Sequence, residues 1–400
     1  MKRRTYLATA TAAAATVAGC SALTGSETSD GENGDDGENG DDNGSSDPVN
    51  EEPGSFDEFE DLSKWTVEEG SLTADEDRVY TGTQSARMEA DGSTERIMIK
   101  REFDTPRDLS DEFPALAFAS DHDVSPTVQL TDTDGDRLFL RCAVREDGPL
   151  VRHDLGVVNT DGDPDLSSID HTKISVWAGD RELSLWCDDY HFVERPETGK
   201  VMLQFPESTP DVASEAAPIL AEYDVPGTVF VSTNYVGADG YLSQSDLESL
   251  QDDGWIVASG GATGTDLTQH DESRQEAELS SAAEWLDDNG FDSAYYSYGL
   301  NRYDESSLEL AEEYHDLAFT GGYAGHGNLS NPHLAPRATN PDPADAGQLL
   351  EWTADQRLIT TFSYRNVGES LDDLEAVLSA LDDHDVDVVT PDDVAAENLH

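Results

Sequence analysis

Glu207 and four histidines are the side chains of the C-terminal half that we consider first for metal binding or proton transfer, because carboxylate and imidazole groups do both. Glu207 follows the apolar run Val201–Phe205 after one proline, Pro206. The histidines are His315, His326, His333 and His384. His326 and His333 flank a Gly- and Asn-rich loop and lack the spacing of a metal-binding pair, so solvated surface histidines are the favoured interpretation and a new metal site is the weaker alternative.

Two aspartate-rich segments, 132–136 and 161–165, are the next candidates for metal chemistry. A helix–loop–helix calcium site needs a bidentate Glu at its twelfth position, but Ala143 stands there. Such clusters in a very acidic chain are typical of hairpin tips. We therefore predict turns at both segments and keep structural calcium as an alternative.

From residue 199 onward, short apolar runs alternate with amphipathic helical patterns. The runs that predict strands are 201–205, 227–231, 255–258, 295–298, 317–319, 358–362 and 386–389. The patterns that predict helices are 211–223, 245–250, 272–288, 305–314 and 371–381. Repeated units of this length predict a parallel sheet closed into a barrel, with functional residues at the C-terminal ends of its strands.

Three segments of this region resemble the polysaccharide deacetylase (NodB-like) family. They are 217–231, a helix ahead of the second strand; 247–256, which contains Asp-Asp-Gly-Trp; and 388–394, with Val-Thr-Pro-Asp-Asp-Val. The resemblance covers about 199–400 and implies a distorted (β/α) barrel of the deacetylase type. It also implies a zinc or other divalent metal, held by one Asp and two His, that polarises an acetamide carbonyl and activates a water.

The residues at the positions that matter for this chemistry differ from the family pattern. The resemblance places the catalytic base at Pro206, the metal-binding Asp at Glu207, the two His ligands at Gly260 and Gly264, and the general-acid His at Ser363. Proline cannot accept a proton and glycine has no ligating atom. We therefore expect no cofactor and predict a deacetylase-like pseudoenzyme, with an active N-acetyl hydrolase using a displaced site as the first alternative.

The predicted mouth of the barrel is rich in groups that hydrogen-bond sugars. The candidate glycan-binding residues there are Glu207, Ser208, Ser259, Thr263, Tyr298 and Arg337. Arg337 could bind a sugar carboxylate or sulfate through its bidentate fork, or pair with one of the many acidic residues of the chain. The leading hypothesis is a barrel that binds extracellular polysaccharide or glycoprotein glycans. A purely structural envelope component is the remaining alternative.

Residues 55–197 show alternating rather than helical patterns and predict an all-β, jelly-roll-like sandwich. Gly82–Met88 and Asp188–Phe192 loosely resemble modules of the carbohydrate-binding kind. The aromatic residues that could stack on a sugar ring are Trp65, Tyr80, Trp177, Trp186 and Tyr190. Most of them are expected in the core, and Trp177 and Trp186 are kept as glycan-binding candidates. Cys142 and Cys187 could form a disulfide or remain buried thiols.

The charge of the chain narrows the classes of partner. The formal net charge is -63, with 86 acidic residues and 23 Lys plus Arg. Acid-rich, Lys-poor surfaces suit a protein of a halophilic organism, because in molar salt the Debye length falls to roughly 3 Å and self-repulsion is screened. Nucleic acid is excluded as an expected partner, since no basic face is visible in the sequence.

The sequence of the N-terminus predicts an export signal. Arg3 and Arg4 precede a short Ala-rich apolar run that ends at Val17-Ala-Gly-Cys20. This pattern predicts a twin-arginine signal over 1–20 and a lipid on Cys20 that holds the protein at the extracellular face of the cytoplasmic membrane. Residues 21–54 repeat Asp, Gly, Glu and Asn with almost no apolar side chains and predict an acidic tether.

Overall fold

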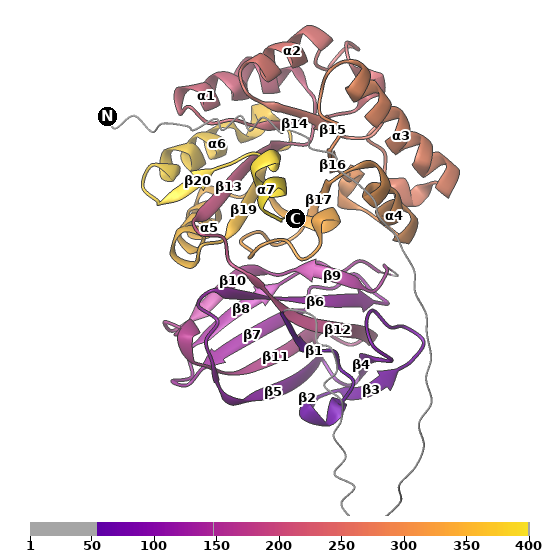
Figure 1. Ribbon diagram of the computed structural model, residues 1–400, viewed down its shortest axis with the longest axis vertical. Helices are drawn as coiled ribbons and strands as arrows, with labels where there is room; N and C mark the ends of the chain where they lie inside the picture. Colours follow the sequence, from indigo (N-terminus) through magenta and orange to yellow (C-terminus); the bar gives the residue numbers. More distant parts are fainter. Residues whose placement is uncertain (1–53, 147, 399–400) are drawn as a thin grey trace, which may run out of the picture. The chain divides into compact units, whose positions relative to one another are not determined.

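The computed structural model of the chain describes residues 54–146 and 148–398. These residues belong to one compact unit, Glu51–His400, in which a β-sandwich is followed by a parallel barrel (Figure 1). The predicted signal, the lipidation site at Cys20 and nearly all of the predicted tether lie outside the described residues.

The sandwich consists of two six-stranded antiparallel sheets. Sheet A contains β3 (Ser71–Asp75), β4 (Ser85–Asp91), β12 (Glu182–Glu194), β6 (Glu112–Ser120) and β9 (Val151–Asp154) in that order, with β1 (Ser55–Asp57) also paired to β12. Sheet B has the order β10 (Gly156–Asp161), β8 (Arg137–Arg141), β7 (Thr127–Asp132), β11 (Ile169–Trp177), β5 (Arg96–Arg107) and β2 (Thr66–Glu69).

Alternating apolar residues join the two sheets through a common core. Met88 and Leu185 from sheet A pack in the same buried cluster as Ile97 and Ile174 from sheet B. The strands expected from alternation are present, and the antiparallel all-β prediction is confirmed at that level; the jelly-roll assignment stays a prediction. The turn at Gly179, with φ of 67°, does not make a hairpin, because it carries the chain from β11 in sheet B to β12 in sheet A.

The barrel is a ring of seven parallel strands. Along the ring these are β13 (Gly199–Phe205), β14 (Thr228–Val231), β15 (Ile256–Ser259), β16 (Tyr295–Ser297), β17 (Leu317–Gly321), β18 (Ala335–Thr339) and β19 (Ile359–Ser363). Pairing of Gln204 and Phe205 with Thr228 and Val229 closes the ring, whereas β20 (Val386–Val388) pairs with the opposite end of β13. Every residue of β13 is buried. The predicted parallel barrel is therefore confirmed.

Helices cover the outside of the barrel. They are a π-helical turn Val212–Ala216, α1 (Ala217–Glu222), α2 (Gln244–Asp252), α3 (Glu272–Asp288), α4 (Glu305–Tyr314), α5 (Pro343–Gln356) and α6 (Val367–Leu381). The last helix, α7 (Pro391–Asn398), is drawn over the middle of the ring in Figure 1, and its Val394 packs in the same buried cluster as Met202 and Phe230. Short 3-10 turns occupy Leu62–Lys64, Leu166–Ser168, Thr233–Tyr235, Leu267–Gln269, Gly299–Asn301 and Pro332–Leu334. Capping boxes at Ser243 and Asp304 fix where α2 and α4 begin, because their side chains satisfy free backbone amides.

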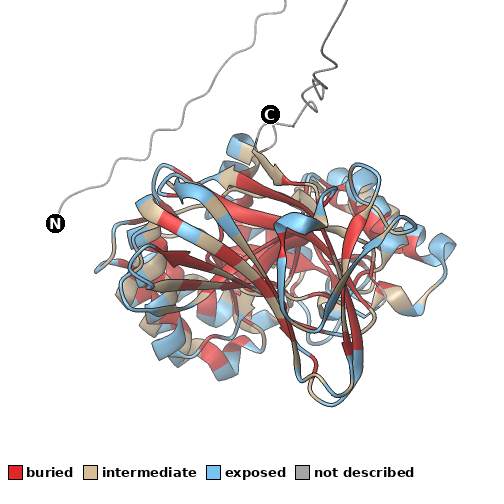
Figure 2. Cartoon of the chain, turned by 90° about the horizontal axis from the view of Figure 1, so that it is seen from below, coloured by how far each residue is buried: buried red, intermediate tan, exposed pale blue. Residues whose placement is uncertain are grey.

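Hydrogen bonds link the sandwich to the barrel within the compact unit. The Ser330 amide donates to Asp154 Oδ1 at 2.8 Å, the Val157 amide to the Gly325 carbonyl at 3.1 Å, and Arg195 Nη1 to the Gln356 carbonyl at 2.9 Å. Buried residues follow the strands, while exposed residues gather on outer helix faces and loops (Figure 2).

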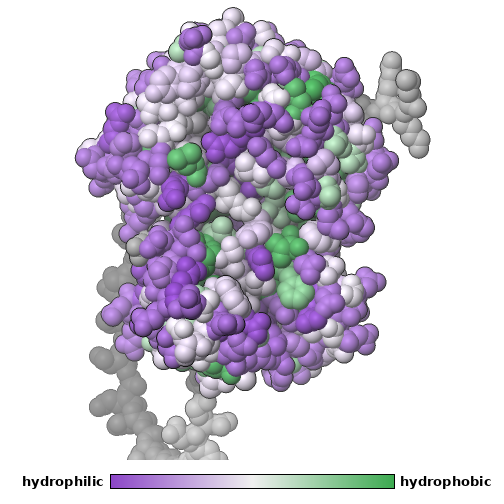
Figure 3. Space-filling view, turned by 180° about the vertical axis from the view of Figure 1, so that it is seen from behind, coloured by the Kyte–Doolittle hydropathy of each residue, from purple (hydrophilic) through white to green (hydrophobic). Residues whose placement is uncertain are grey.

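The surface agrees with the acidic composition. The face drawn in Figure 3 is mostly hydrophilic, with scattered hydrophobic residues. Within the described parts of the chain, no helix is both long enough and apolar enough to cross a membrane. Cys142 and Cys187 are both buried free thiols, which settles the open question of their pairing.

Candidate functional site

A cavity of about 410 Å³ lies at the mouth of the barrel, where its strands end; we call it the mouth cavity. It is lined by Pro206, Glu207, Ser208, Thr209, Ser232, Gly240, Tyr241, Gly260, Thr263, Gly264, Ser297, Tyr298, Gly299, Leu300, Asn301, Arg337, Thr339, Ser363 and Arg365. The structure thus brings together the glycan-binding candidates of the barrel, except Ser259, and all the positions compared with the family pattern, as expected for residues that follow parallel strands.

Ser259 is the exception. It is the last residue of β15, it is fully buried, and it is not among the residues that line the cavity. Its hydroxyl accepts a hydrogen bond from the Gly261 amide at 3.2 Å. The side chain therefore shapes the loop after β15 and does not face a ligand in the mouth.

Thr263 lines the cavity, but its hydroxyl is already in use. Both its amide and its Oγ1 donate to Glu278 Oε2, at 2.7 and 2.9 Å. Glu278 comes from α3, is 2% exposed, and also accepts from Arg274 Nη2 at 2.5 Å. This buried carboxylate, which the sequence reading did not select, fixes the loop that contains Gly260 and Gly264.

Glu207 is held by an ion pair rather than left free. Its Oε1 accepts from Arg365 Nε at 3.1 Å, and its Oε2 accepts from the Asn366 amide at 3.1 Å. Both oxygens are therefore engaged before any ligand arrives. A carboxylate in this arrangement neutralises a neighbouring guanidinium and is a poor candidate for a lone metal ligand.

The surroundings of Gly260 and Gly264 leave little space for a side chain at either position. A Cβ added at Gly260 would lie 3.2 Å from the Val231 carbonyl carbon. Gly264 has φ of +67°, and a Cβ there would lie 2.5 Å from Ser232 Oγ. Restoring histidines at these two positions therefore requires the loop and Ser232 to move, so the difference from the family pattern extends beyond the side chains.

Arg337 on β18 is a buried cation with neutral neighbours. It is 2% exposed, and its Nη2 donates to Ser297 Oγ at 2.8 Å and to Asn301 Oδ1 at 2.9 Å. Its Nη1 donates to Gln204 Oε1 at 3.3 Å. No described carboxylate forms an ion pair with it. One interpretation of Arg337 was an ion pair with an acidic residue of the chain. No such pair is present among the described residues.

Burial makes this positive charge costly. Desolvation, and next the nearby charge of Arg365, lower the pKa of Arg337 to about 9. Its Nε has no hydrogen-bond partner among the described residues. An anionic or strongly accepting ligand in the mouth cavity would stabilise the charged guanidinium, because it would supply the partner that the protein does not.

Further donors surround Arg337. Tyr298 Oη and Ser363 Oγ line the cavity, are buried, and have no hydrogen-bond partner among the described residues. Ser363 is the strand neighbour of Gln204, whose Nε2 is likewise without a partner in the described part of the chain. Buried polar groups usually find partners, so this cluster is the kind of site that a polar ligand completes.

The residues at the mouth do not fit the divalent metal that the family resemblance implies. No group of three or more His, Cys, Asp or Glu side chains within 54–146 and 148–398 is arranged to hold a metal ion. The only carboxylate that lines the cavity is Glu207, and its oxygens are engaged. No step of a metal-dependent reaction is therefore derived for this site.

The four histidines are separate structural groups. Nδ1 of His315, His326 and His384 contacts the carbonyls of Ser293, Gly327 and Ala380, and Nε2 of His333 contacts the carbonyl of His315, all at 2.6 to 2.9 Å. His315 also stacks on Tyr296, with ring centroids 5.0 Å apart. Each ring is used within the fold. His326 is 1% exposed, so its interpretation as a solvated surface histidine is wrong.

Tyr235 and Tyr241 were missed by the sequence reading. Their rings stack with centroids 5.0 Å apart, both are 37% exposed, and Tyr241 lines the mouth cavity. They lie in the loop after β14. The signal available in the sequence was their position after a barrel strand, since such loops build the site in this class of fold.

The aromatic residues of the sandwich that were candidates for stacking on a sugar differ in their surroundings. Trp65 and Tyr190 belong to the core, as expected. Trp186 is committed to the protein, because its Nε1 donates to Asp75 Oδ2 at 2.7 Å and Arg78 covers its ring at 4.3 Å. Trp177 on β11 is 62% exposed and Tyr80 is 41% exposed.

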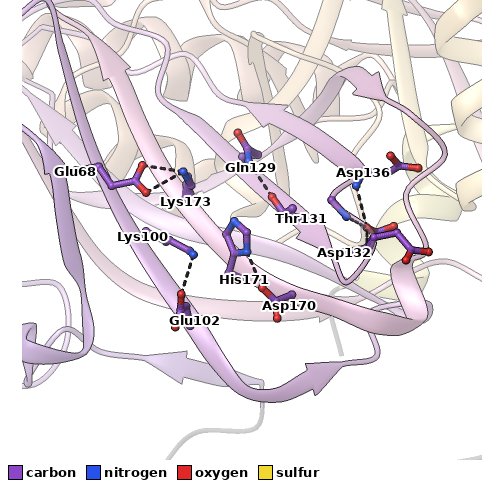
Figure 4. A network of polar contacts seen from close by, with 12 residues as sticks. Glu68, Lys100, Glu102, Gln129, Thr131, Asp132, Asp136, Asp170, His171 and Lys173 are labelled. Atoms are coloured by element: carbon purple, nitrogen blue, oxygen red, sulfur yellow. Dashed lines mark hydrogen bonds and ion pairs between the residues drawn. The ribbon is translucent and has the colours of Figure 1, made fainter.

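The aspartate-rich loops are stabilised by their own backbone. Asp132 Oδ1 accepts from the amides of Asp134, Gly135 and Asp136 at 2.8 to 2.9 Å (Figure 4). Asp132 Oδ2 accepts from the amide of Asp165 at 2.9 Å, which ties the two loops together. Asp132 thus caps the turn between the paired strands β7 and β8, as predicted for a hairpin tip. The hairpin-tip prediction is wrong for 161–165, because this segment joins β10 to β11, which are not neighbours in sheet B.

Comparison with known proteins identifies a family match for part of the chain. Residues 194–315 match the family described as Polysaccharide deacetylase. No curated protein matches the sequence. Among solved structures, the Streptococcus pyogenes deacetylase PplD in complex with acetate is 23% identical with a TM-score of 0.32, and the match covers 34% of this chain and 62% of that one.

Two further structures illustrate the range of similarity. The Xyl-CE4 domain of a multidomain xylanase from the hindgut metagenome of Trinervitermes trinervoides is 13% identical, with a TM-score of 0.40 and coverage of 50% of this chain and 91% of that one. A wild-type CE4 family pseudoenzyme from Bacillus anthracis is 11% identical, with a TM-score of 0.37 and coverage of 51% and 66%. The family match itself establishes that residues 194–315 form a polysaccharide deacetylase domain.

Proposed function

We propose that the barrel binds a glycan without hydrolysing it. One observation carries this proposal: no position around the mouth cavity offers a free base or a set of metal ligands. Pro206, Gly260 and Gly264 have no group for these roles, and Glu207 is paired with Arg365. The polysaccharide deacetylase domain supports polysaccharide as the class of ligand.

Binding would rest on the donors that lack partners. Arg337 would contact a carboxylate, a sulfate or an acetamide oxygen, and the hydroxyls of Tyr298 and Ser363 would complete hydrogen bonds to the same sugar. The exposed face of the Tyr235–Tyr241 pair at the rim offers a stacking surface for a neighbouring ring. These contacts bind and orient a sugar, and none of them activates a water.

The proposed setting is extracellular. The twin-arginine pattern and Cys20 support export and lipid anchoring at the outer face of the cytoplasmic membrane, and the net charge of -63 supports a high-salt environment. In this setting the barrel would hold surface polysaccharide or glycoprotein glycans near the cell.

The test combines catalysis and binding in one set of samples. Acetate release from acetylated glycans is measured at molar salt with added zinc or cobalt, for the wild type, Glu207→Ala and Arg337→Gln. We expect no release, and saturable binding that Arg337→Gln weakens at least tenfold. Release abolished by Glu207→Ala would overturn the proposal in favour of a displaced active site. Neither release nor binding would favour a structural envelope component.

A further inference from the structure

A second cavity of about 670 Å³ lies on the outer face of sheet B; we call it the sheet B groove. It is lined by Arg96, Met98, Asp123, Val124, Ser125, Thr127, Gln129, Phe139, Arg141, Ala143, Val144, Arg145, Ser175, Val176, Trp177, Arg181 and Tyr323. Except for Tyr323, these residues belong to the sandwich. The groove is therefore distinct from the mouth cavity, with which it shares no lining residue.

The register of sheet B places these side chains in rows across four strands. One row contains Met98, Ser175, Thr127 and Arg141, and the next contains Lys100, Lys173, Gln129 and Phe139. Alternate residues of each strand point outward, since Ile97, Ile174 and Val128 between them are buried in the core. The rows form a continuous outer surface of polar, basic and aromatic groups.

The charge of the groove is opposite to that of the chain. Its lining includes Arg96, Arg141, Arg145 and Arg181 but a single acidic residue, Asp123, in a protein of net charge -63. Clustering of this kind is unexpected if arginines only neutralise nearby acids. It points to a ligand that brings negative charge to this face.

Two of these arginines keep their guanidinium groups available. Arg141 and Arg181 are exposed, and neither forms an ion pair with a described carboxylate. Arg141 Nε donates to Thr127 Oγ1 at 3.0 Å, which orients the group and leaves its terminal nitrogens for a ligand. Arg96, in contrast, is paired with Glu69 at 2.6 Å. An oriented, unpaired arginine matches the planar geometry of carboxylate and sulfate groups.

Trp177 supplies a stacking surface in the same groove. It is 62% exposed and is the strand neighbour of Arg96. A large exposed aromatic side chain beside hydroxyl and amide groups such as Ser175 and Gln129 is suited to the apolar face of a sugar ring and to its hydroxyls.

Two lysines lie beside the groove on sheet B, and each is paired with a glutamate. Lys100 and Lys173 are direct cross-strand neighbours, an arrangement that destabilises a sheet unless it is compensated. Glu68 and Glu102 compensate it, at 2.7 Å from Lys173 and 2.8 Å from Lys100 (Figure 4). Each lysine is neutralised by a carboxylate, so this row adds no net positive charge to the face.

We propose that the sheet B groove binds an anionic polysaccharide whose carboxylate or sulfate groups pair with Arg141 and Arg181 while a sugar ring stacks on Trp177. The inference rests on the proposed function only in taking the ligand to be a glycan, and it adds a second site with a defined ligand class. Two sites on one chain would increase the avidity for a long polymer.

The test measures binding of three polymers to the full chain: alginate as a polyuronate, dextran sulfate, and neutral dextran. Affinity is followed by calorimetry, and local contact is followed by the protection of tryptophan fluorescence from acrylamide, to which the exposed Trp177 contributes most. We expect saturable binding of the anionic polymers, with protection, and at least a tenfold preference over neutral dextran.

Matched variants locate the site. Arg141→Gln combined with Arg181→Gln, and separately Trp177→Ala, should each weaken alginate binding at least tenfold. Arg78→Gln changes the charge by one unit on sheet A, beside Trp186, and should change affinity less than twofold. These groove side chains lie outside the core, so circular dichroism is expected to show an unchanged fold.

The outcomes separate this inference from the proposed function. Alginate binding that survives the double arginine variant, or that is lost only in Arg337→Gln, would overturn the groove assignment. Equal affinity for single-stranded DNA of the same charge density would overturn the choice of a glycan. If the mouth binds no acetylated glycan but the groove variants still abolish alginate binding, the proposed function fails and the groove stands.

Discussion

The mouth cavity and the sheet B groove both use arginine, but they differ in how the cation is held. Arg337 is buried and hydrogen-bonded to neutral side chains, whereas Arg141 and Arg181 are exposed and line an open groove. The buried cation is desolvated before a ligand binds, so a single good acceptor stabilises it strongly. The exposed cations keep their water, so each contributes little and affinity depends on several contacts along a polymer. The comparison suggests that the mouth cavity selects a single acceptor group, whereas the sheet B groove binds repeated charges along a polymer.

The largest expected effect concerns acid stability, and both regions contribute to it through a buried histidine. Burial lowers the pKa of His153 in the sandwich and of His315 in the barrel to about 4. In the unfolded chain each histidine gains its proton near pH 6.5 while the folded one stays neutral. Stability is therefore full above pH 6.5 and falls between pH 6.5 and 4, by about 3 kcal/mol for each histidine.

His153→Gln and His315→Gln should each flatten the acid limb of the unfolding free energy. Urea unfolding at several pH values gives this slope. Asp188 acts in the opposite sense, because burial raises its pKa to about 6 and the folded state then holds the proton more tightly. For this reason variants are compared with the wild type at each pH. Identical slopes in the wild type and both variants would show that the folded rings already carry a proton in this range, so that unfolding takes up none.

The second prediction compares glycines in the two regions. Gly264→Ala should destabilise the protein by about 2–3 kcal/mol, because it combines a positive φ with a contact to Ser232. Gly135→Ala, at a hairpin tip of sheet B with φ of +96° and no atom within 4 Å of an added Cβ, should cost about 1 kcal/mol. Denaturant midpoints measure both. Equal losses would indicate that the loop at the mouth adapts easily.

The third prediction uses the pKa of the mouth arginine. Binding of glucuronate at the mouth should weaken as the pH rises above about 9, because Arg337 then loses the charge that pairs with the carboxylate. The loss should approach tenfold one unit above that pKa. Calorimetric titration measures it, with Arg337→Gln as the control, whose weak binding should not change over the same range.

The smallest expected effect is that of Glu207→Ala on stability. The Glu207–Arg365 pair is partly exposed, with side-chain exposures of 29% and 35%. Its removal should cost less than about 1 kcal/mol. Freed from its partner, Arg365 would add a second cation to the cavity and strengthen glucuronate binding. Weaker binding in this variant would mean that Glu207 itself contacts the sugar.

The sequence was sufficient for most of the barrel but not for all of it. The strands with continuous apolar runs and α3 and α4 were located closely, because burial of both faces leaves a clear pattern. Strand β18 was missed, since Ala335-Pro-Arg-Ala-Thr339 contains a proline and a charge and resembles a loop. Its arginine is buried only because β13 and β16 supply polar partners from distant parts of the chain.

The position of the site could be predicted from the ends of the strands, but the contacts between its residues could not. Two such contacts join residues far apart in the sequence. Thr263 is bound by Glu278, 15 positions away, and Trp186 is bound by Asp75, 111 positions away. Alternation alone could not separate Trp177 from Trp186, because both sit on outer faces of strands. The groove arginines were likewise not predictable as a cluster, since β5 and β8, which carry Arg96 and Arg141, and the connecting segments with Arg145 and Arg181 come together only when the sandwich forms.

The two buried thiols give a chemical measure of how the sandwich opens. Burial raises the pKa of Cys142 and Cys187, so neither forms a reactive thiolate while the core is closed. Both belong to the core shared by the two sheets, whereas the sequence from 199 to 400 contains no cysteine. The rate at which an alkylating reagent modifies Cys142 and Cys187 therefore reports transient opening of the sandwich, and a bound polymer that bridges sheet B should slow that modification.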